Sequence, residues 1–190
     1  MHLHEAGKVT NRKPLYPGHT VATFALGSER LYRWLDGNAA VRMLPVTDVN
    51  DGWVLRQLPR LTSINGALSV DLAGQIAADS IGNRQYSGAG GHESFVSGAG
   101  AAPDGRSFLC LRSTATVGGK RVSTIVASFV VGTCVTTPRH HVQYVVTEHG
   151  AVDLSVLSDV ERPRALIELA HPDFRDALRA ALRSQEGIHE

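Results

Sequence analysis

The sequence predicts an α/β fold in which an open, mostly parallel sheet carries helices on both faces, built as a single domain over residues 1–190. Three observations lead to this prediction. Short apolar runs alternate with amphipathic helical segments along the chain. The Val- and Ile-rich runs at 122–130 and 142–150 are continuous, which is typical of strands buried on both faces. The 190 residues are 43% hydrophobic and 19% charged, a balance that suits a chain with a sizeable core.

The individual elements follow from apolar patterning and from helix start and stop signals. β-forming apolar runs predict strands over 19–26, 40–46, 63–74 (a strand or a hairpin), 106–113, 122–130 and 142–150. Helices are predicted after Ser28, over 48–58, after Gly91, after Ser158 and from Pro172 onward. Ser28 and Ser158 are N-cap residues in this prediction, and Asp48 or Asn50 caps the helix over 48–58.

Charge and cysteine content exclude several classes of function. The formal net charge is +1, so neither nucleic acid nor an acidic or membrane surface is the expected partner. No stretch approaches the roughly 18 apolar residues of a membrane span, and no signal peptide is apparent. Cys110 and Cys134 lie between apolar residues without a C-x-x-C neighbour, which predicts buried, reduced thiols and a cytoplasmic protein rather than a disulfide.

The histidines do not form a metal-binding pattern. His140 and His141 are adjacent, so in a strand their side chains point to opposite faces and cannot hold one ion together. No H-x-x-x-H spacing occurs either. We therefore expect no metal.

The segment SGAGGHESF (87–95) is the most unusual stretch, with three glycines in four positions. It is not a G-x-G-x-x-G fingerprint, because Glu93 stands where the last glycine belongs, and the only Gly-Lys pair lacks a Walker motif around it. Glycine backbone together with free N–H groups at the start of a helix can bind an anion or the oxyanion of an acyl-transfer intermediate. The alternative is a glycine-rich loop that simply turns a corner.

Eight segments, taken in order, resemble the C-terminal half of the acetyl-CoA hydrolase/4-hydroxybutyrate CoA-transferase family. No single one is specific, but together they cover nearly the whole chain. The segments are GKVTN (7–11), PGHTVATFALGSERLY (17–32), PVTDVND (45–51), SINGALSVDLAGQIAADSIG (63–82), RQYSGAGGHESF (84–95), RSTA (112–115), VTTPRHHVQYVVTEHG (135–150) and RPRALIELAHPDFRDAL (162–178).

The resemblance implies coenzyme A thioester chemistry. In that family a glutamate attacks the acyl-CoA carbonyl, and the resulting glutamyl-CoA thioester passes coenzyme A to a second acid. The family's glycine loop matches residues 88–91, and it implies that Gly91, with Gly90 next, donates a backbone N–H to the oxyanion. Gly88 and Ala89 would then contact substrate. Asn50 matches a position facing the acyl group, with a helix cap as the equal alternative.

The coenzyme A site is predicted at the end of a strand, where α/β sheets bind their ligands. Ser113 and Thr114 end the strand in RSTA and would contact coenzyme A, although hydroxyls that bond only the backbone are the alternative. Lys120 would meet a phosphate, against the alternative of a solvated charge. Two departures from the family pattern affect this region: Ser94 replaces an expected aspartate, and Arg112 replaces a usual proline.

The resemblance places the family's nucleophilic glutamate upstream of Met1, together with an N-terminal α/β half that this chain lacks. We therefore expect an N-terminal half, fused or supplied as another chain, an acyl-CoA and a small carboxylic acid as partners, with no permanently bound cofactor. An apolar patch near the glycine loop and a homo-oligomer are further expectations. Glu93 is a weak substitute nucleophile. The alternatives are an acyl-CoA hydrolase and a non-catalytic module that binds coenzyme A or a partner.

Overall fold

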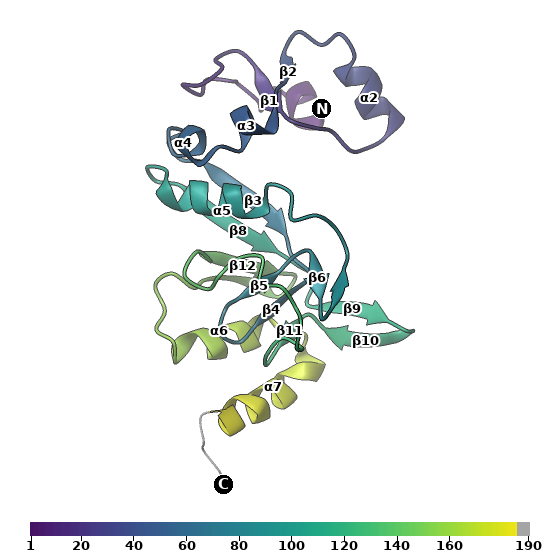
Figure 1. Ribbon diagram of the computed structural model, residues 1–190, viewed down its shortest axis with the longest axis vertical. Helices are drawn as coiled ribbons and strands as arrows, with labels where there is room; N and C mark the ends of the chain where they lie inside the picture. Colours follow the sequence, from purple (N-terminus) through teal and green to yellow (C-terminus); the bar gives the residue numbers. More distant parts are fainter. Residues whose placement is uncertain (186–190) are drawn as a thin grey trace.

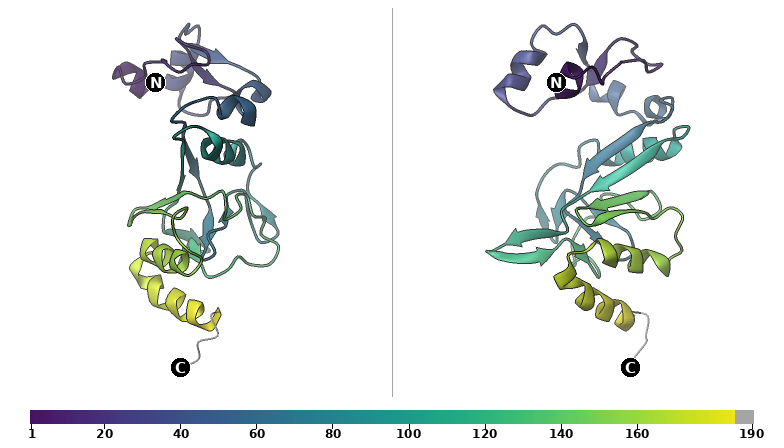
Figure 2. Two further views of the ribbon diagram at one scale, coloured as in Figure 1. Left: turned by 90° about the vertical axis from the view of Figure 1, so that its left-hand side faces the viewer. Right: turned by 180° about the vertical axis from the view of Figure 1, so that it is seen from behind.

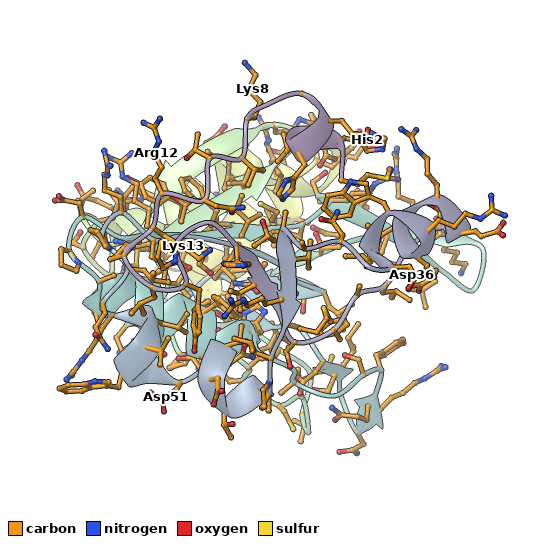
Figure 3. The ribbon with its side chains drawn as sticks, turned by 90° about the horizontal axis from the view of Figure 1, so that it is seen from above. His2, Lys8, Arg12, Lys13, Asp36 and Asp51 are labelled. Atoms are coloured by element: carbon orange, nitrogen blue, oxygen red, sulfur yellow. The ribbon has the colours of Figure 1, made fainter. Side chains whose placement is uncertain are left out.

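The computed structural model describes residues 1–185 and shows an elongated molecule, with the first helix, α1, and the last helix, α7, toward opposite poles (Figure 1). The N-terminal part forms a small lobe at one pole. Its elements are α1 (His2–Glu5), β1 (Thr20–Ala22), α2 (Glu29–Leu35), β2 (Val41–Met43), α3 (Val46–Val49) and α4 (Gly52–Leu55). Strands β1 and β2 pair in parallel. Seen from above, Lys8 and Arg12 extend outward from this lobe, whereas Lys13 lies over the body of the molecule (Figure 3).

A four-stranded sheet in the order β13-β12-β8-β3 forms the centre of the molecule. Its strands are β3 (Thr62–Gly66), β8 (Arg106–Cys110), β12 (Tyr144–Thr147) and β13 (Gly150–Asp153). The first three run parallel to one another, and β13 returns antiparallel beside β12. The carboxyl ends of three strands therefore meet at one edge of this sheet.

Smaller strands and three helices complete the fold. A second sheet joins β11 (Ile125–Val126), β4 (Ser69–Asp71) and β5 (Ile76–Ala77). Two hairpins project from the body: β6 (Ser80–Ile81) with β7 (Arg84–Gln85), and β9 (Thr114–Val117) with β10 (Lys120–Ser123). The helices are α5 (His92–Ala101), α6 (Glu161–Leu169) and α7 (Pro172–Gln185).

The core lies on one face of the four-stranded sheet. Leu109 and Val145 point into it and are fully buried, together with Val96 of α5 and Leu166 of α6. Because about 25 cal/mol is gained for each Å² of apolar surface removed from water, this cluster is the main source of stability. The expected helix layer is therefore present on this face.

The opposite face of the sheet carries no helix within the described residues. Ile64, Phe108 and Tyr144 lie side by side in register on this face. Ile64 is 72% exposed, and the Phe108 and Tyr144 rings stack with centroids 4.7 Å apart. The view from behind shows these strands uncovered (Figure 2). A mostly parallel α/β sheet is thus confirmed, with one layer of helices rather than two in this chain.

Several predicted elements are confirmed, and the boundaries of others differ. Helix α2 begins after Ser28, whose Oγ accepts a hydrogen bond from the Leu31 N–H. The single helix predicted over 48–58 is wrong, because the chain forms α3 and α4 with a break at Asn50. Asp51 causes the new start, since its carboxylate accepts the N–H groups of Trp53 and Val54. The run at 122–130 is likewise shorter than predicted and is divided between β10 and β11.

The cysteine prediction is correct in one respect and wrong in another. Cys110 and Cys134 are both free thiols, as expected. Neither is fully buried as predicted: Cys110 is half-buried, and Cys134 is exposed because the chain around it is a loop and not a strand of the core. Across residues 1–185, no helix combines the length and the apolar character needed to cross a membrane.

Candidate functional site

The glycine loop ends at the first turn of α5, as the sequence predicts. Gly90 has a φ of +59°, a backbone conformation that favours glycine, and Gly91 is the N-cap residue of the helix. The N–H groups of a helix's first turn have no partner within the helix. They carry partial positive charge, so this point of the fold can stabilise a negatively charged oxygen.

A cavity of about 300 Å³ opens beside Gly91, between the N-terminal lobe and α5. Its walls are largely apolar, with a few polar groups that could orient a ligand. The lining residues are Val21, Ala22, Thr23, Phe24, Val49, Asn50, Asn65, Gly91, His92 and Phe95.

Gly91 and Asn50 meet in this cavity although 41 positions separate them in the sequence. A Cβ atom added to Gly91 would lie only 2.3 Å from Asn50 Nδ2, so only glycine allows this approach. Asn50 ends α3 through its backbone N–H, which donates to the Val46 carbonyl. Within the described residues, Oδ1 of its side chain is buried without a hydrogen-bond partner. The Nδ2 atom of the amide is the one that lies against Gly91.

Packing between α4 and α5 holds Asn50 in place. Gly98 of α5 allows the contact, because a Cβ there would lie 2.7 Å from Leu55 Cβ. Leu55 is 1% exposed and closes α4, which begins immediately after Asn50 and Asp51. The small lobe is thus fixed to the body next to the cavity.

The glycine loop is anchored at its base and open at its tip. The N–H groups of Tyr86 and Ser87 donate to the Asp79 carbonyl. The Asp79 carboxylate accepts bonds from Thr136 and Gln85, and the Thr136 bond in particular lowers the pKa of Asp79. By contrast, the predicted substrate contacts Gly88 and Ala89 are exposed at the tip and do not line the cavity. Gly90 does not line the cavity either, although it directly precedes Gly91 in the chain.

A second cavity, of about 670 Å³, lies at the carboxyl ends of the three parallel strands. Ala67 follows β3, Arg112 follows β8 and Glu148 follows β12, so each strand contributes to the lining. Thr114, a predicted coenzyme A contact, also lines it. This position agrees with the general rule that α/β sheets bind ligands beyond the carboxyl ends of their strands.

Ser113, the other predicted coenzyme A contact, does not line this cavity. It is fully buried, and both its N–H and its Oγ donate to the Glu148 carboxylate, at 2.9 and 2.5 Å. These bonds lower the pKa of Glu148 to about 2. Ser113 therefore holds Glu148 at the cavity, and a contact between Ser113 and coenzyme A stays a prediction.

Lys120 lies at the end of the projecting β9–β10 hairpin, is exposed and lines neither of these two cavities. Its neighbour Arg121 forms an ion pair with Asp173 at the start of α7. The structure therefore does not bring Lys120 together with Gly91 and Asn50.

Two polar residues, His92 and Glu93, lie at the start of α5. Sequence reasoning assigned no role to His92 and only a weak one to Glu93. Glu93 accepts a hydrogen bond from Thr137 at 2.7 Å and contacts His141 at 2.5 Å, so both its oxygens are engaged. His92 lines the Gly91 cavity and is 8% exposed. A lone histidine carries little signal in a sequence, and only its position next to the glycine loop could have indicated a role.

The chain is an α/β domain with one cavity at the carboxyl edge of a parallel sheet and another beside a glycine-capped helix. The family model described as "Acetyl-CoA hydrolase/transferase C-terminal domain" matches residues 27–182. The chain belongs to this family, as the eight segments indicated.

Curated relatives are similar in sequence to nearly the whole of this chain. The "Probable butyrate:acetyl-CoA coenzyme A-transferase" of Syntrophomonas wolfei is 41% identical over 92% of this chain and 39% of its own length. The "4-hydroxybutyrate coenzyme A transferase" of Clostridium kluyveri is 40% identical over 94% of this chain and 41% of its own length.

Solved structures of similar fold also match nearly the whole of this chain. The crystal structure of RipA from Yersinia pestis superposes with a TM-score of 0.88 at 41% identity, and the match covers 99% of this chain and 42% of that one. The 4-hydroxybutyrate CoA-transferase of Porphyromonas gingivalis superposes with a TM-score of 0.79 at 32% identity, over 97% of this chain and 42% of that one. The chain thus spans about two fifths of the length of these relatives.

Proposed function

We propose that this chain acts as the C-terminal domain of an acyl-CoA:carboxylate CoA-transferase and supplies the oxyanion-binding backbone and the acyl cavity. The observation that carries the proposal is the contact between Gly91, at the start of α5, and Asn50 in one small cavity. Backbone N–H groups aimed at a developing oxyanion are among the strongest contributions to acyl transfer.

In this proposal the thioester carbonyl of the acyl-CoA lies in the cavity with its oxygen toward the Gly91 N–H. The attacking carboxylate is a glutamate of an N-terminal half, as the family resemblance implies. It adds to the carbonyl carbon, and the negative charge that forms on the carbonyl oxygen is stabilised by the N–H of Gly91, with Gly90 next. The neutral Asn50 amide can orient the acyl group without neutralising that glutamate.

Glu93 does not suit the part of the nucleophile. Both of its oxygens are engaged by Thr137 and His141, and it follows Gly91 by only two residues in the helix that would hold the oxyanion. Glu5 pairs with Arg30 in the N-terminal lobe. These contacts support a glutamate from outside this chain.

Coenzyme A itself is proposed to extend toward the larger cavity at the strand ends. Thr114 and Arg112 line that cavity and offer a hydroxyl and a guanidinium to the cofactor's polar groups. Gly88, Ala89 and Lys120 remain proposed contacts at the edge of the site, on the exposed loop tip and the β9–β10 hairpin. No permanently bound cofactor forms part of this proposal, and coenzyme A thioester is the substrate.

An N-terminal half is the proposed partner, fused or supplied as a separate chain. Exposed apolar residues near the site support it, because large apolar patches on a protein surface are unfavourable unless a partner covers them. Phe24 is 73% exposed in the cavity wall and Leu26 is 84% exposed just beyond it. Tyr86, just before the glycine loop, is 51% exposed, and Val131, whose carbonyl oxygen lies near Gly82, is 96% exposed. Homo-oligomers are a further proposal. The two free thiols support a cytoplasmic location.

The test is acyl-CoA turnover by the chain alone and after mixing with the N-terminal half of a transferase from this family. We expect transfer of coenzyme A from butyryl-CoA to acetate only in the mixture. Turnover by the chain alone would contradict an external nucleophile. Release of free coenzyme A without an acceptor acid would indicate a hydrolase. Coenzyme A binding without any turnover in the mixture would indicate a binding module.

A further inference from the structure

The ring of Phe95 lies beside Gly91, in the wall of the Gly91 cavity. Phe95 is in the first turn of α5, and its N–H donates to the Gly91 carbonyl at 3.0 Å. Residues four apart on a helix share one face, and long side chains lean toward the helix N-terminus. Accordingly, Phe95 Cδ2 would lie 3.4 Å from a Cβ built on Gly91. The ring therefore borders the position proposed for the thioester carbonyl.

A smaller cavity, of about 120 Å³, adjoins the Gly91 cavity. Val21, Val49 and Phe95 line both cavities, so these three side chains separate them. We call the smaller one the Leu58 cavity, after a residue that lines it alone. Its other apolar walls come from the N-terminal lobe and the segment after it: Leu15, Tyr16, Val54, Leu55 and Leu58.

The Leu58 cavity is suited to an alkyl chain. Only Lys13 and Asp48 carry charge among its lining residues. Lys13 Nζ already donates to the His19 carbonyl, and partial burial lowers the pKa of Lys13. The remaining walls offer apolar contact, and burying an alkyl chain against such walls is favourable.

We propose that Phe95 is a specificity-determining residue, whose ring closes the Gly91 cavity toward the Leu58 cavity and thereby limits the length of the acyl chain. The proposal rests on the proposed function, since it assumes that the acyl group occupies the Gly91 cavity. Val21 and Val49 have shorter side chains, so Phe95 is the largest of the three residues that separate the cavities. Removing its ring would join the two spaces and admit a longer chain.

The experiment measures the ratio of kcat/KM for hexanoyl-CoA to that for butyryl-CoA, in the mixture with the N-terminal half. We expect Phe95→Ala to raise this ratio by about tenfold, the lower end of what a pocket gains or loses per methylene. Phe95→Leu is a milder change, and it decides the question if thermal unfolding shows that Phe95→Ala does not fold. It should raise the ratio by a smaller factor.

Two further variants show where the longer chain goes. Leu58→Phe places a larger side chain in the wall of the Leu58 cavity. Combined with Phe95→Ala it should abolish most of the rise, whereas alone it should leave the wild-type ratio unchanged. Phe174→Ala is the matched control, because Phe174 is also a half-buried helical phenylalanine but lines neither cavity. It should keep the wild-type ratio.

Three results would overturn the inference alone. The first is an unchanged ratio in folded Phe95 variants that turn over both substrates. The second is an equal rise in Phe174→Ala, which would reflect a general loosening of the fold. The third is a rise that persists when Leu58→Phe is added, which would place the longer chain elsewhere. If the wild-type mixture turns over neither substrate, the proposed function fails and the inference fails with it, so the wild-type measurement separates the two failures.

Discussion

Replacing Gly91 by alanine should remove function while leaving the fold nearly intact. The new Cβ would lie 2.3 Å from Asn50 Nδ2 and 3.4 Å from Phe95 Cδ2. The backbone does not oppose the change, because Gly91 has a φ of −93°, which any residue adopts. The closest atom is the end of a flexible side chain, so we expect Asn50 to rotate away while the helices stay in place.

We expect Gly91→Ala to lose little stability but much activity. Alanine is a poorer N-cap residue than glycine, so the free energy of unfolding should fall by about 1 kcal/mol or less. The displaced amide and the added methyl group both disturb the point where the oxyanion forms. Alanine keeps the backbone N–H, so the loss comes from moving the carbonyl oxygen away from it. Losing the contact with one oxyanion donor costs about 10²–10³ in rate in other acyl-transfer enzymes, so we expect kcat/KM to fall about 10²-fold.

The assay combines thermal unfolding of the chain with kcat/KM for butyryl-CoA in the mixture with the N-terminal half. Gly100→Ala is the matched control, since it changes the same helix at an exposed position with nothing within 4 Å of the new Cβ. That variant should gain about 0.5–1 kcal/mol of stability and keep full activity. Turnover by Gly91→Ala within about threefold of wild type would refute the assigned role, given the cost of such groups elsewhere.

Three further predictions concern the supports of the site. Gly98→Ala places a Cβ 2.7 Å from Leu55 Cβ, so we expect about 1–3 kcal/mol lower stability in urea, and an unchanged midpoint would contradict the packing role. The Glu148 pKa is lowered from 4.5 to about 2, so its stabilisation is present above pH 4.5 and lost as pH falls through 2. Ser113→Ala should remove about 1 kcal/mol of it, discounted for the half-exposed carboxylate, and pH-dependent melting that matches wild type would disprove this. Glu93→Gln should retain turnover, and complete inactivity in a folded variant would identify Glu93 as the nucleophile.

The sequence predicted local features of the site well. The helix after Gly91 follows from a glycine run succeeded by HESFVSGA, and α5 begins at the next residue. Ser28 was a correct cap, because capping depends only on neighbouring residues. The 112–115 segment lies at the carboxyl edge of the sheet, where Arg112, Thr114 and Ala115 line the larger cavity, and coenzyme A binding there stays a prediction.

Long-range contacts were beyond sequence reasoning. Ser113 was predicted to face a ligand, but Glu148, 35 residues later, takes both of its donors. The break at Asn50 depends on Asp51 capping a new helix, and both Asp48 and Asn50 were equally good cap candidates in the sequence. The burial of His92 depends on the cavity that the N-terminal lobe closes, and no periodic pattern encodes that cavity.

The wall of the Gly91 cavity is divided between two parts of the chain, so the spacing of these two parts sets the width of the cavity. Phe24 and Asn50 belong to the small N-terminal lobe, whereas Gly91 and His92 belong to the body. The α4–α5 contact sets the spacing between them, so a substitution at Leu55, which does not line the cavity, would change its width. Under the proposed function, such a change would alter the length of acyl chain that fits while leaving the Gly91 backbone in place.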